Sequence, residues 1–149
     1  PRHPRFVECR LMQLSVPSEP QPDVKTAWTL VDSLRTIAPH FPGSYDGRRY
    51  QMWAAAVLAR AGLADSARHV LVRNRVGEQI DPARDLETME AYVRVVLDTP
   101  QDRNEALRLI KDIMAANPEH DVTNDKATDW WFRPLQTDPR WAELRRASR

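Results

Sequence analysis

Residues 50–61 read YQMWAAAVLARA and carry the clearest structural signal in the chain. Apolar side chains recur there at every third or fourth position, which places them on one face of an α-helix. They are Tyr50, Trp53, Ala54, Val57, Leu58 and Ala61. The stretch is also rich in alanine, which is the strongest helix former. The pattern therefore predicts an amphipathic helix over residues 46–61.

The same periodicity continues on both sides of this stretch. It predicts further helices over residues 4–14, 23–38, 63–76, 83–98 and 101–116, with a short one near 139–147. Alternating apolar and polar residues of strand length are missing. The nearest candidate, VLVRNRV at 70–76, is interpreted as the last turns of a helix that ends before Gly77. The sequence thus predicts an all-α fold.

Prolines and glycines fall where these helices should begin and end. Asp81-Pro82 and Asp138-Pro139 each place a capping carboxylate before a proline at the first helical position. Gly62 separates two apolar stripes, and Asn117-Pro118 ends another. Near the start, the stripe is expected to contain Phe6, and the lone Cys9 is expected to be a buried apolar residue.

Three alanines mark an internal repeat. Ala27, Ala67 and Ala106 follow one another at intervals of about 40 residues. The residues around the first and the third agree at identical spacing, because Ala27, Val31, Leu34 and Pro39 match Ala106, Ile110, Ile113 and Pro118. The middle repeat keeps Ala67 and Leu71 but has Asn74 and Gln79 at the other two places. The repeats are therefore divergent copies of one helical unit.

This pattern resembles the second helix of the tetratricopeptide repeat, although its spacing exceeds the family's usual length of about 34 residues. The resemblance implies about three antiparallel helical hairpins, stacked as a short right-handed solenoid. The three repeats would occupy residues 4–39, 46–82 and 83–118, within 1–118. The remaining residues, 119–149, would form a capping tail.

The tail itself resembles the closing segment of bacterial tetratricopeptide proteins. It reads WWFRPL at residues 130–135 and DPRW at 138–141. Its aromatic rings can be interpreted in two ways, as a binding surface or as a cap that covers the last repeat, and capping is favoured because terminal repeats need it. The resemblance also implies that the chain is the C-terminal part of a larger bacterial protein.

Composition excludes several classes of function. The 149 residues hold 22 basic and 21 acidic side chains, for a net charge of +1, whereas nucleic-acid-binding domains are strongly basic. No apolar run reaches the roughly 20 residues needed to span a bilayer, so no membrane insertion is expected. The compartment, cytoplasmic or periplasmic, and the oligomeric state stay open.

Motifs of catalysis, cofactor binding and metal binding are missing from the sequence. Gly43 and Gly47 do not form a phosphate-binding loop, and the four histidines lack ligand spacing. Asp65, Ser66 and His69 contain the residue types of a hydrolase triad. They are interpreted as surface residues of a helix, because no oxyanion donor accompanies them. We therefore expect no enzyme activity, no cofactor and no metal.

The tetratricopeptide resemblance implies a partner-binding groove lined by the first helix of each repeat. Carried over to this chain, the groove comprises Arg49, Met52, Ala56, Arg60, Thr88, Ala91 and Val95. The two arginines could hold a carboxylate, or they could be solvated residues without a ligand. The expected function is a scaffold that binds a protein or peptide. The alternative is a structural or regulatory appendage of an upstream enzyme such as a kinase or cyclase.

Overall fold

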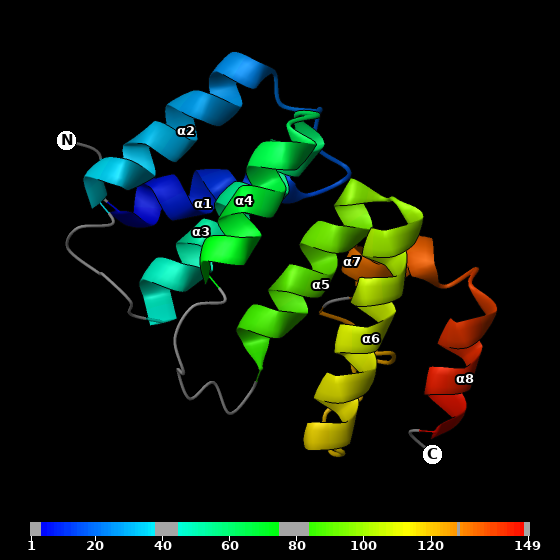
Figure 1. Ribbon diagram of the computed structural model, residues 1–149. Helices are drawn as coiled ribbons and strands as arrows, with labels where there is room; N and C mark the ends of the chain where they lie inside the picture. Colours follow the sequence, from blue (N-terminus) through cyan, green and yellow to red (C-terminus); the bar gives the residue numbers. More distant parts are fainter. Residues whose placement is uncertain (1–3, 38–44, 75–83, 128, 148–149) are drawn as a thin grey trace. The chain divides into compact units, whose positions relative to one another are not determined.

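The computed structural model describes residues 4–37, 45–74, 84–127 and 129–147, and all regular structure in these ranges is helical (Figure 1). The first helices are α1 (Pro4–Ser15), α2 (Val24–Ile37), α3 (Tyr45–Arg60) and α4 (Ala64–Asn74). They are followed by α5 (Asp85–Leu97), α6 (Pro100–Ala116), α7 (Asp129–Phe132), the 3₁₀-helix η2 (Arg133–Leu135) and α8 (Pro139–Ala147). The all-α prediction is confirmed for these residues, and each main helix lies close to its expected range.

The chain divides into two compact units, Pro1–Asp81 and Pro82–Arg149. The first unit contains α1 to α4, and the second contains α5 to α8 with η2. We describe each unit by itself. None of the helices in the described ranges has the length and apolar character needed to cross a membrane.

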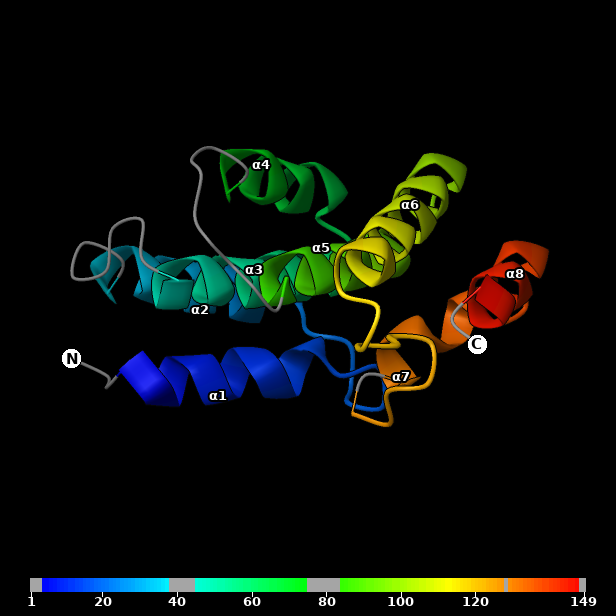
Figure 2. The same ribbon diagram turned by 90° about the horizontal axis from the view of Figure 1, so that it is seen from below.

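Helix α3 is the centre of the first unit. It packs against α1, α2 and α4, and Figure 2 shows α1 and α4 on opposite sides of it. The stretch that gives the strongest helical signal is accordingly buried, and Ala54, Ala55, Ala56, Val57 and Leu58 are fully inaccessible. Neighbouring helices can approach α3 closely on several sides, because alanine side chains extend only a short distance from the backbone.

Gly62 makes the turn between α3 and α4. Its backbone has φ of +79°, a left-handed conformation that glycine adopts without strain. The Leu63 N–H donates to Leu58 O at 2.9 Å and the Gly62 N–H to Ala59 O at 3.0 Å, which satisfies carbonyls at the end of α3. The short connection then folds α4 back along α3 as an antiparallel hairpin.

The buried face of α1 differs from the expected one. Val7, Leu11 and Leu14 are buried, whereas Phe6 is 57% exposed and Cys9 is also exposed. The buried residues follow a spacing of four and then three, so Phe6 and Cys9 are rotated away from them around the helix. The expectations for Phe6 and Cys9 were therefore wrong, because adjacent positions on a helix face different directions.

The second unit is built on the hairpin of α5 and α6. Arg84 and Asp98, which flank α5, have φ of 54° and 57°, and the helix begins at Asp85 rather than at 83. Asp81-Pro82 and Gly77, the expected helix signals in this part of the chain, lie outside the described residues. Helix α6 starts at Pro100, and the Thr99 side chain caps it by accepting from the Asp102 N–H at 3.1 Å.

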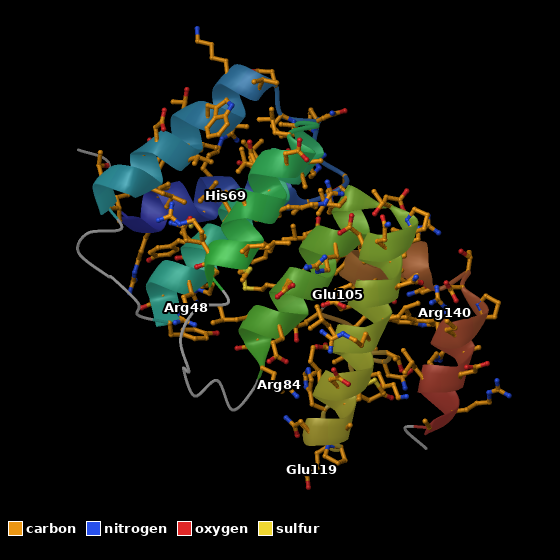
Figure 3. All side chains as sticks on the ribbon, viewed as in Figure 1. Arg48, His69, Arg84, Glu105, Glu119 and Arg140 are labelled. Atoms are coloured by element: carbon orange, nitrogen blue, oxygen red, sulfur yellow. The ribbon has the colours of Figure 1, made fainter. Side chains whose placement is uncertain are left out.

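The tail folds onto this hairpin. Helix α7 packs against α5, and α8 packs against α6. Pro139 opens α8 as expected, with Asp138 Oδ1 accepting from the Arg140 N–H at 2.9 Å. Arg140, labelled in Figure 3, also donates from Nη1 to Asn104 Oδ1 of α6 at 2.7 Å. Helix α7 and η2 were not predicted, because each spans a single turn or less.

Candidate binding groove

The first unit contains a groove of about 710 Å³. It lies between α2, α3 and α4. The lining residues are Trp28, Val31, Gln51, Leu58, Asp65, Ser66, His69, Val70, Arg73 and Asn74. Its volume falls within the range of roughly 300–1,000 Å³ that is usual for ligand sites. Apolar and polar side chains are mixed along it, so it can accept a ligand with both kinds of group.

Helix α4 supplies one wall because it has two distinct faces. Ala67 and Leu71 are buried and belong to the face that packs in the hairpin. Ser66, His69, Val70 and Arg73 follow one another at helical spacing and form a neighbouring stripe, which lines the groove. This stripe is only partly covered, because His69 and Arg73 are exposed and Ser66 and Val70 are half-buried.

Helices α2 and α3 supply the other walls. Val31 and Leu58 are 7% and 0% exposed, whereas Trp28 and Gln51 are half-buried and accessible from the groove. Gln51 and Leu58 lie seven residues apart on α3, as do Ser66 and Arg73 on α4. At a rise of 1.5 Å per residue, the groove extends about 10 Å along these helices. That length corresponds to about three extended residues, or to two turns of a helix.

Positive charge dominates one end of the groove. Arg73 lies near the end of α4, one turn after His69, which Figure 3 labels on the same helix. At this end Arg48 of α3 donates from Nη1 to Asn74 O at 3.5 Å. At the other end, Asp65 pairs with Arg68, with 3.6 Å between Oδ1 and Nη1. A ligand entering the groove therefore meets a basic end and an end where an acidic and a basic side chain lie together.

The sequence-predicted groove residues of the first unit lie elsewhere. Met52 and Ala56 are 4% and 0% exposed. The Arg49 guanidinium is 2.7 Å from Glu8 Oε1 of α1, measured from Nη2. Arg60 donates from Nη1 to Leu14 O, and from Nη2 to Glu19 O at 2.6 Å. In this structure both arginines therefore bind other parts of their own unit.

The sequence-predicted residues of the second unit are buried as well. Thr88, Ala91 and Val95 of α5 are 6%, 0% and 5% exposed, and Thr88 Oγ1 donates to Arg84 O at 3.0 Å. Of the seven residues taken from the family resemblance, five are therefore buried and the two arginines bind groups of their own unit. Their role in binding a partner stays a prediction, and none of them lines the α2–α4 groove.

The triad-like residues do lie in the groove. Asp65, Ser66 and His69 all line it, but no hydrogen bond joins any two of them in the described part of the chain. Asp65 instead faces Arg68. A serine nucleophile requires hydrogen-bond contact with its base and an oxyanion site. The arrangement supplies polar contacts for a ligand but not the relay that acyl transfer needs.

Sequence reasoning missed the residues that give the groove its character. Trp28, Gln51, Val70 and Arg73 come from three helices and share no motif. One signal was available for Arg73, which lies beside the stripe of Ala67 and Leu71, whereas Trp28 was expected on the apolar stripe of the helix over residues 23–38. Large or charged side chains just outside a buried stripe border the seam between helices, where grooves form.

The aromatic residues of the tail are packed inward in the second unit. Tyr92 of α5 lies with its ring centroid 5.4 Å from that of Trp130 and 5.1 Å from that of Trp131. Phe132 and Trp141 are buried, with centroids 6.0 Å apart. Trp130 and Trp131 are half-buried, so these contacts leave part of each ring accessible. A smaller cavity of about 330 Å³ beside Trp141 is lined mainly by polar residues of the tail.

His120 and Asp121 are neighbours in the tail and have side chains of the types that bind metals. Asp121 Oδ1 accepts from the Thr123 N–H at 2.9 Å, which forms a tight turn, and His120 lies beside it. No cluster of three or more histidine, cysteine or acidic side chains suited to a metal occurs among the residues that the structure describes.

Comparisons with models of protein families, with curated proteins and with solved structures found no match.

Proposed function

We propose that this chain is a helical-repeat module of tetratricopeptide type that binds a short segment of a partner protein in the α2–α4 groove. It acts as a binding or scaffold module rather than as an enzyme. The observation that carries this proposal is the groove itself, which combines apolar side chains with polar ones, such as Gln51 and Arg73, that have no hydrogen bond or ion pair among the described residues.

The repeat interpretation is supported by the position of the three alanines. Ala27, Ala67 and Ala106 are all fully buried, and they lie in α2, α4 and α6, the second helix of each successive pair. In the first unit, α3 packs against both helices of the preceding pair. A small residue at the same place in each second helix and stacking of one pair on the next are what a solenoid requires.

The binding interpretation is supported by the composition of the groove walls. Trp28 offers a large half-buried ring beside the apolar side chains of Val31, Leu58 and Val70. Aromatic anchors such as tryptophan often supply much of the affinity at protein interfaces. The groove is about 10 Å long, which suits a few residues of a peptide better than a folded surface.

Two valines of α4 provide a matched test. Val70 lines the groove and is half-buried, whereas Val72 is 63% exposed and lies on another face of the same helix. The variants Val70→Glu and Val72→Glu make the same chemical change two residues apart. Affinity capture from lysate of the protein's own cells should lose its specific partner with Val70→Glu and keep it with Val72→Glu.

Both variants must keep the helical circular dichroism of the parent chain for this comparison to hold. Capture retained by both variants would remove the groove from the proposal. Loss of capture by both would show that binding is not confined to the groove face of α4, which also contradicts the proposal.

A further inference from the structure

We infer that the α2–α4 groove selects a carboxylate-bearing peptide, in which an apolar side chain fills the groove and an acidic group pairs with Arg73. This inference rests on the proposed function and names the chemistry of its partner. It depends on the charge of one wall of the groove, and not on the repeat family.

Arg73 differs from the other described arginines of the first unit. Six others whose side chains are described have an interaction within the protein: Arg5, Arg10 with Gln13, Arg48 with Asn74, Arg49 with Glu8, Arg60 with Leu14, and Arg68 with Asp65. Arg73 is exposed and has no hydrogen bond or ion pair among the described residues. A guanidinium that lines a groove and lacks an internal acceptor can form a forked pair with an incoming carboxylate.

Neighbouring polar groups in the groove favour the same ligand. His69, Ser66 and Gln51 line it, and they too have no hydrogen bond within the described residues. All three can donate hydrogen bonds. The single acidic side chain in the lining, Asp65, already faces Arg68. The groove therefore offers several donors and a positive charge at Arg73, and its one acidic side chain, Asp65, is exposed and has Arg68 as a basic neighbour.

Helix geometry fixes the spacing that the ligand must match. His69 and Arg73 are separated by one turn of α4, about 6 Å along the axis, and Val70 lies between them. Trp28 and Leu58 line the same groove from the other two helices. An apolar side chain placed at Val70 thus brings the next one or two residues of an extended peptide level with Arg73.

Synthetic peptides of one length can test this chemistry directly. The probes are two seven-residue peptides with a central leucine, one with glutamates and one with lysines at the flanking positions. A seven-nucleotide oligothymidylate carries negative charge without an aliphatic side chain. Each is titrated into the ¹⁵N-labelled full chain, and binding is followed by the amide signals of Val70 and Arg73 and the indole N–H of Trp28.

The glutamate peptide should shift these signals in a saturable way, with an affinity about fivefold or more above that of the lysine peptide. The charge-reversed variant Arg73→Glu should invert this preference. Arg10→Glu is the matched control, because it makes the same change at an exposed arginine of α1 that does not line the groove. It should leave the preference unchanged.

Four results would overturn the inference. These are equal binding of both peptides, tighter binding of the oligonucleotide, binding of neither peptide, and a glutamate preference that survives Arg73→Glu. The proposed function fails separately, because it depends on the comparison of Val70→Glu with Val72→Glu. If capture depends on Val70 but not on the charge at position 73, the proposed function is retained and the inferred preference for a carboxylate is rejected.

Discussion

Arg94 of α5 forms an ion pair with Asp102 of α6, with 3.1 Å between Nη1 and Oδ1. The same guanidinium binds Glu90, since Nε and Nη2 lie 3.0 and 2.9 Å from its Oε1. The side chains of Glu90 and Asp102 are only 5% and 4% exposed. Thr99 Oγ1 donates to the second oxygen of Asp102 at 2.7 Å. One cation thus satisfies two buried carboxylates and joins both helices of the hairpin.

We predict that Arg94→Met strongly destabilises the second unit. The substitution keeps an apolar stem of similar length but leaves Glu90 and Asp102 buried without their cation. Removal of one partner from a buried ion pair costs about 3–5 kcal/mol. Chemical denaturation, followed by circular dichroism, measures the change in the free energy of unfolding.

Arg103→Met is the control for that variant. Arg103 pairs with Asp98 at 2.6 Å, but their side chains are 41% and 56% exposed. Exposed ion pairs contribute about 1 kcal/mol or less. A similar loss of stability for the two variants would show that the buried ion pairs of Arg94 stabilise the hairpin no more than an exposed ion pair does.

We predict that Arg60→Met loosens α1 in the first unit. Its guanidinium donates to the carbonyls of Leu14 and Glu19, and Leu14 lies in the last turn of α1. Loss of the donors leaves these part-buried acceptors unsatisfied, which costs about 1–3 kcal/mol. Hydrogen exchange should become faster in α1 and stay unchanged in α6. Arg73→Met, which removes an arginine without an internal partner, should leave exchange in α1 as it is.

We predict that Trp131→Ala weakens the attachment of the tail to α5. The Trp131 ring packs on Tyr92 at a centroid distance of 5.1 Å and on Trp130 at 5.6 Å. Because Trp131 is half-buried, its loss should cost about 2 kcal/mol, below the range for a fully buried aromatic residue. Hydrogen exchange of α5 should rise. Trp28→Ala, in the first unit, should leave α5 unaffected, and unchanged protection of α5 in Trp131→Ala would argue against a capping role.

The start of α8 should depend on acid pH through Asp138. Hydrogen bonds from the Arg140 side chain and backbone lower the pKa of this carboxyl from 3.8 to about 2. A carboxylate with a lowered pKa stabilises the fold above the unfolded value, and this contribution is lost as pH falls from about 4 through 2. Carboxyl ¹³C NMR measures the titration directly.

Asp138→Asn separates the charge of this residue from its capping role. Asparagine is also a good N-cap, so α8 should keep most of its stability at neutral pH. The dependence of α8 on pH between about 4 and 2 should disappear. If Asp138 titrates at an ordinary carboxyl pKa, the contact with Arg140 is too weak in solution to lower the pKa of this carboxyl.

Much of the fold could be predicted from local patterns. The stripe around Trp53, the alanine registers and Asp138-Pro139 each report on residues a few positions apart, and the structure agrees with them. Phe6 was assigned wrongly because a single position separates it from Val7, and the two point in different directions on the helix. A short and weakly amphipathic helix such as α1 gives too few apolar residues to fix its buried face.

The groove could not be predicted in the same way. It depends on how α2 and α4 lie against α3, so Trp28 and Arg73 come to line one groove through tertiary packing alone. Arg60 shows the converse case, since its acceptors Leu14 and Glu19 lie 46 and 41 residues away in the chain. An arginine that the family resemblance assigns to ligand binding contacts its own chain here, and its role in binding stays a prediction. Local spacing contains no information about such distant partners.

Site-specific photocrosslinking tests the central claim most directly. The photoreactive residue p-benzoylphenylalanine replaces either Val70 in the groove or Val72 on the exposed face of α4. In the protein's own cells, position 70 should give a discrete crosslinked protein, with the attachment site in a short acidic segment, and position 72 should not. Crosslinks of equal yield at both positions, or a product from position 72 alone, would contradict partner binding in the α2–α4 groove.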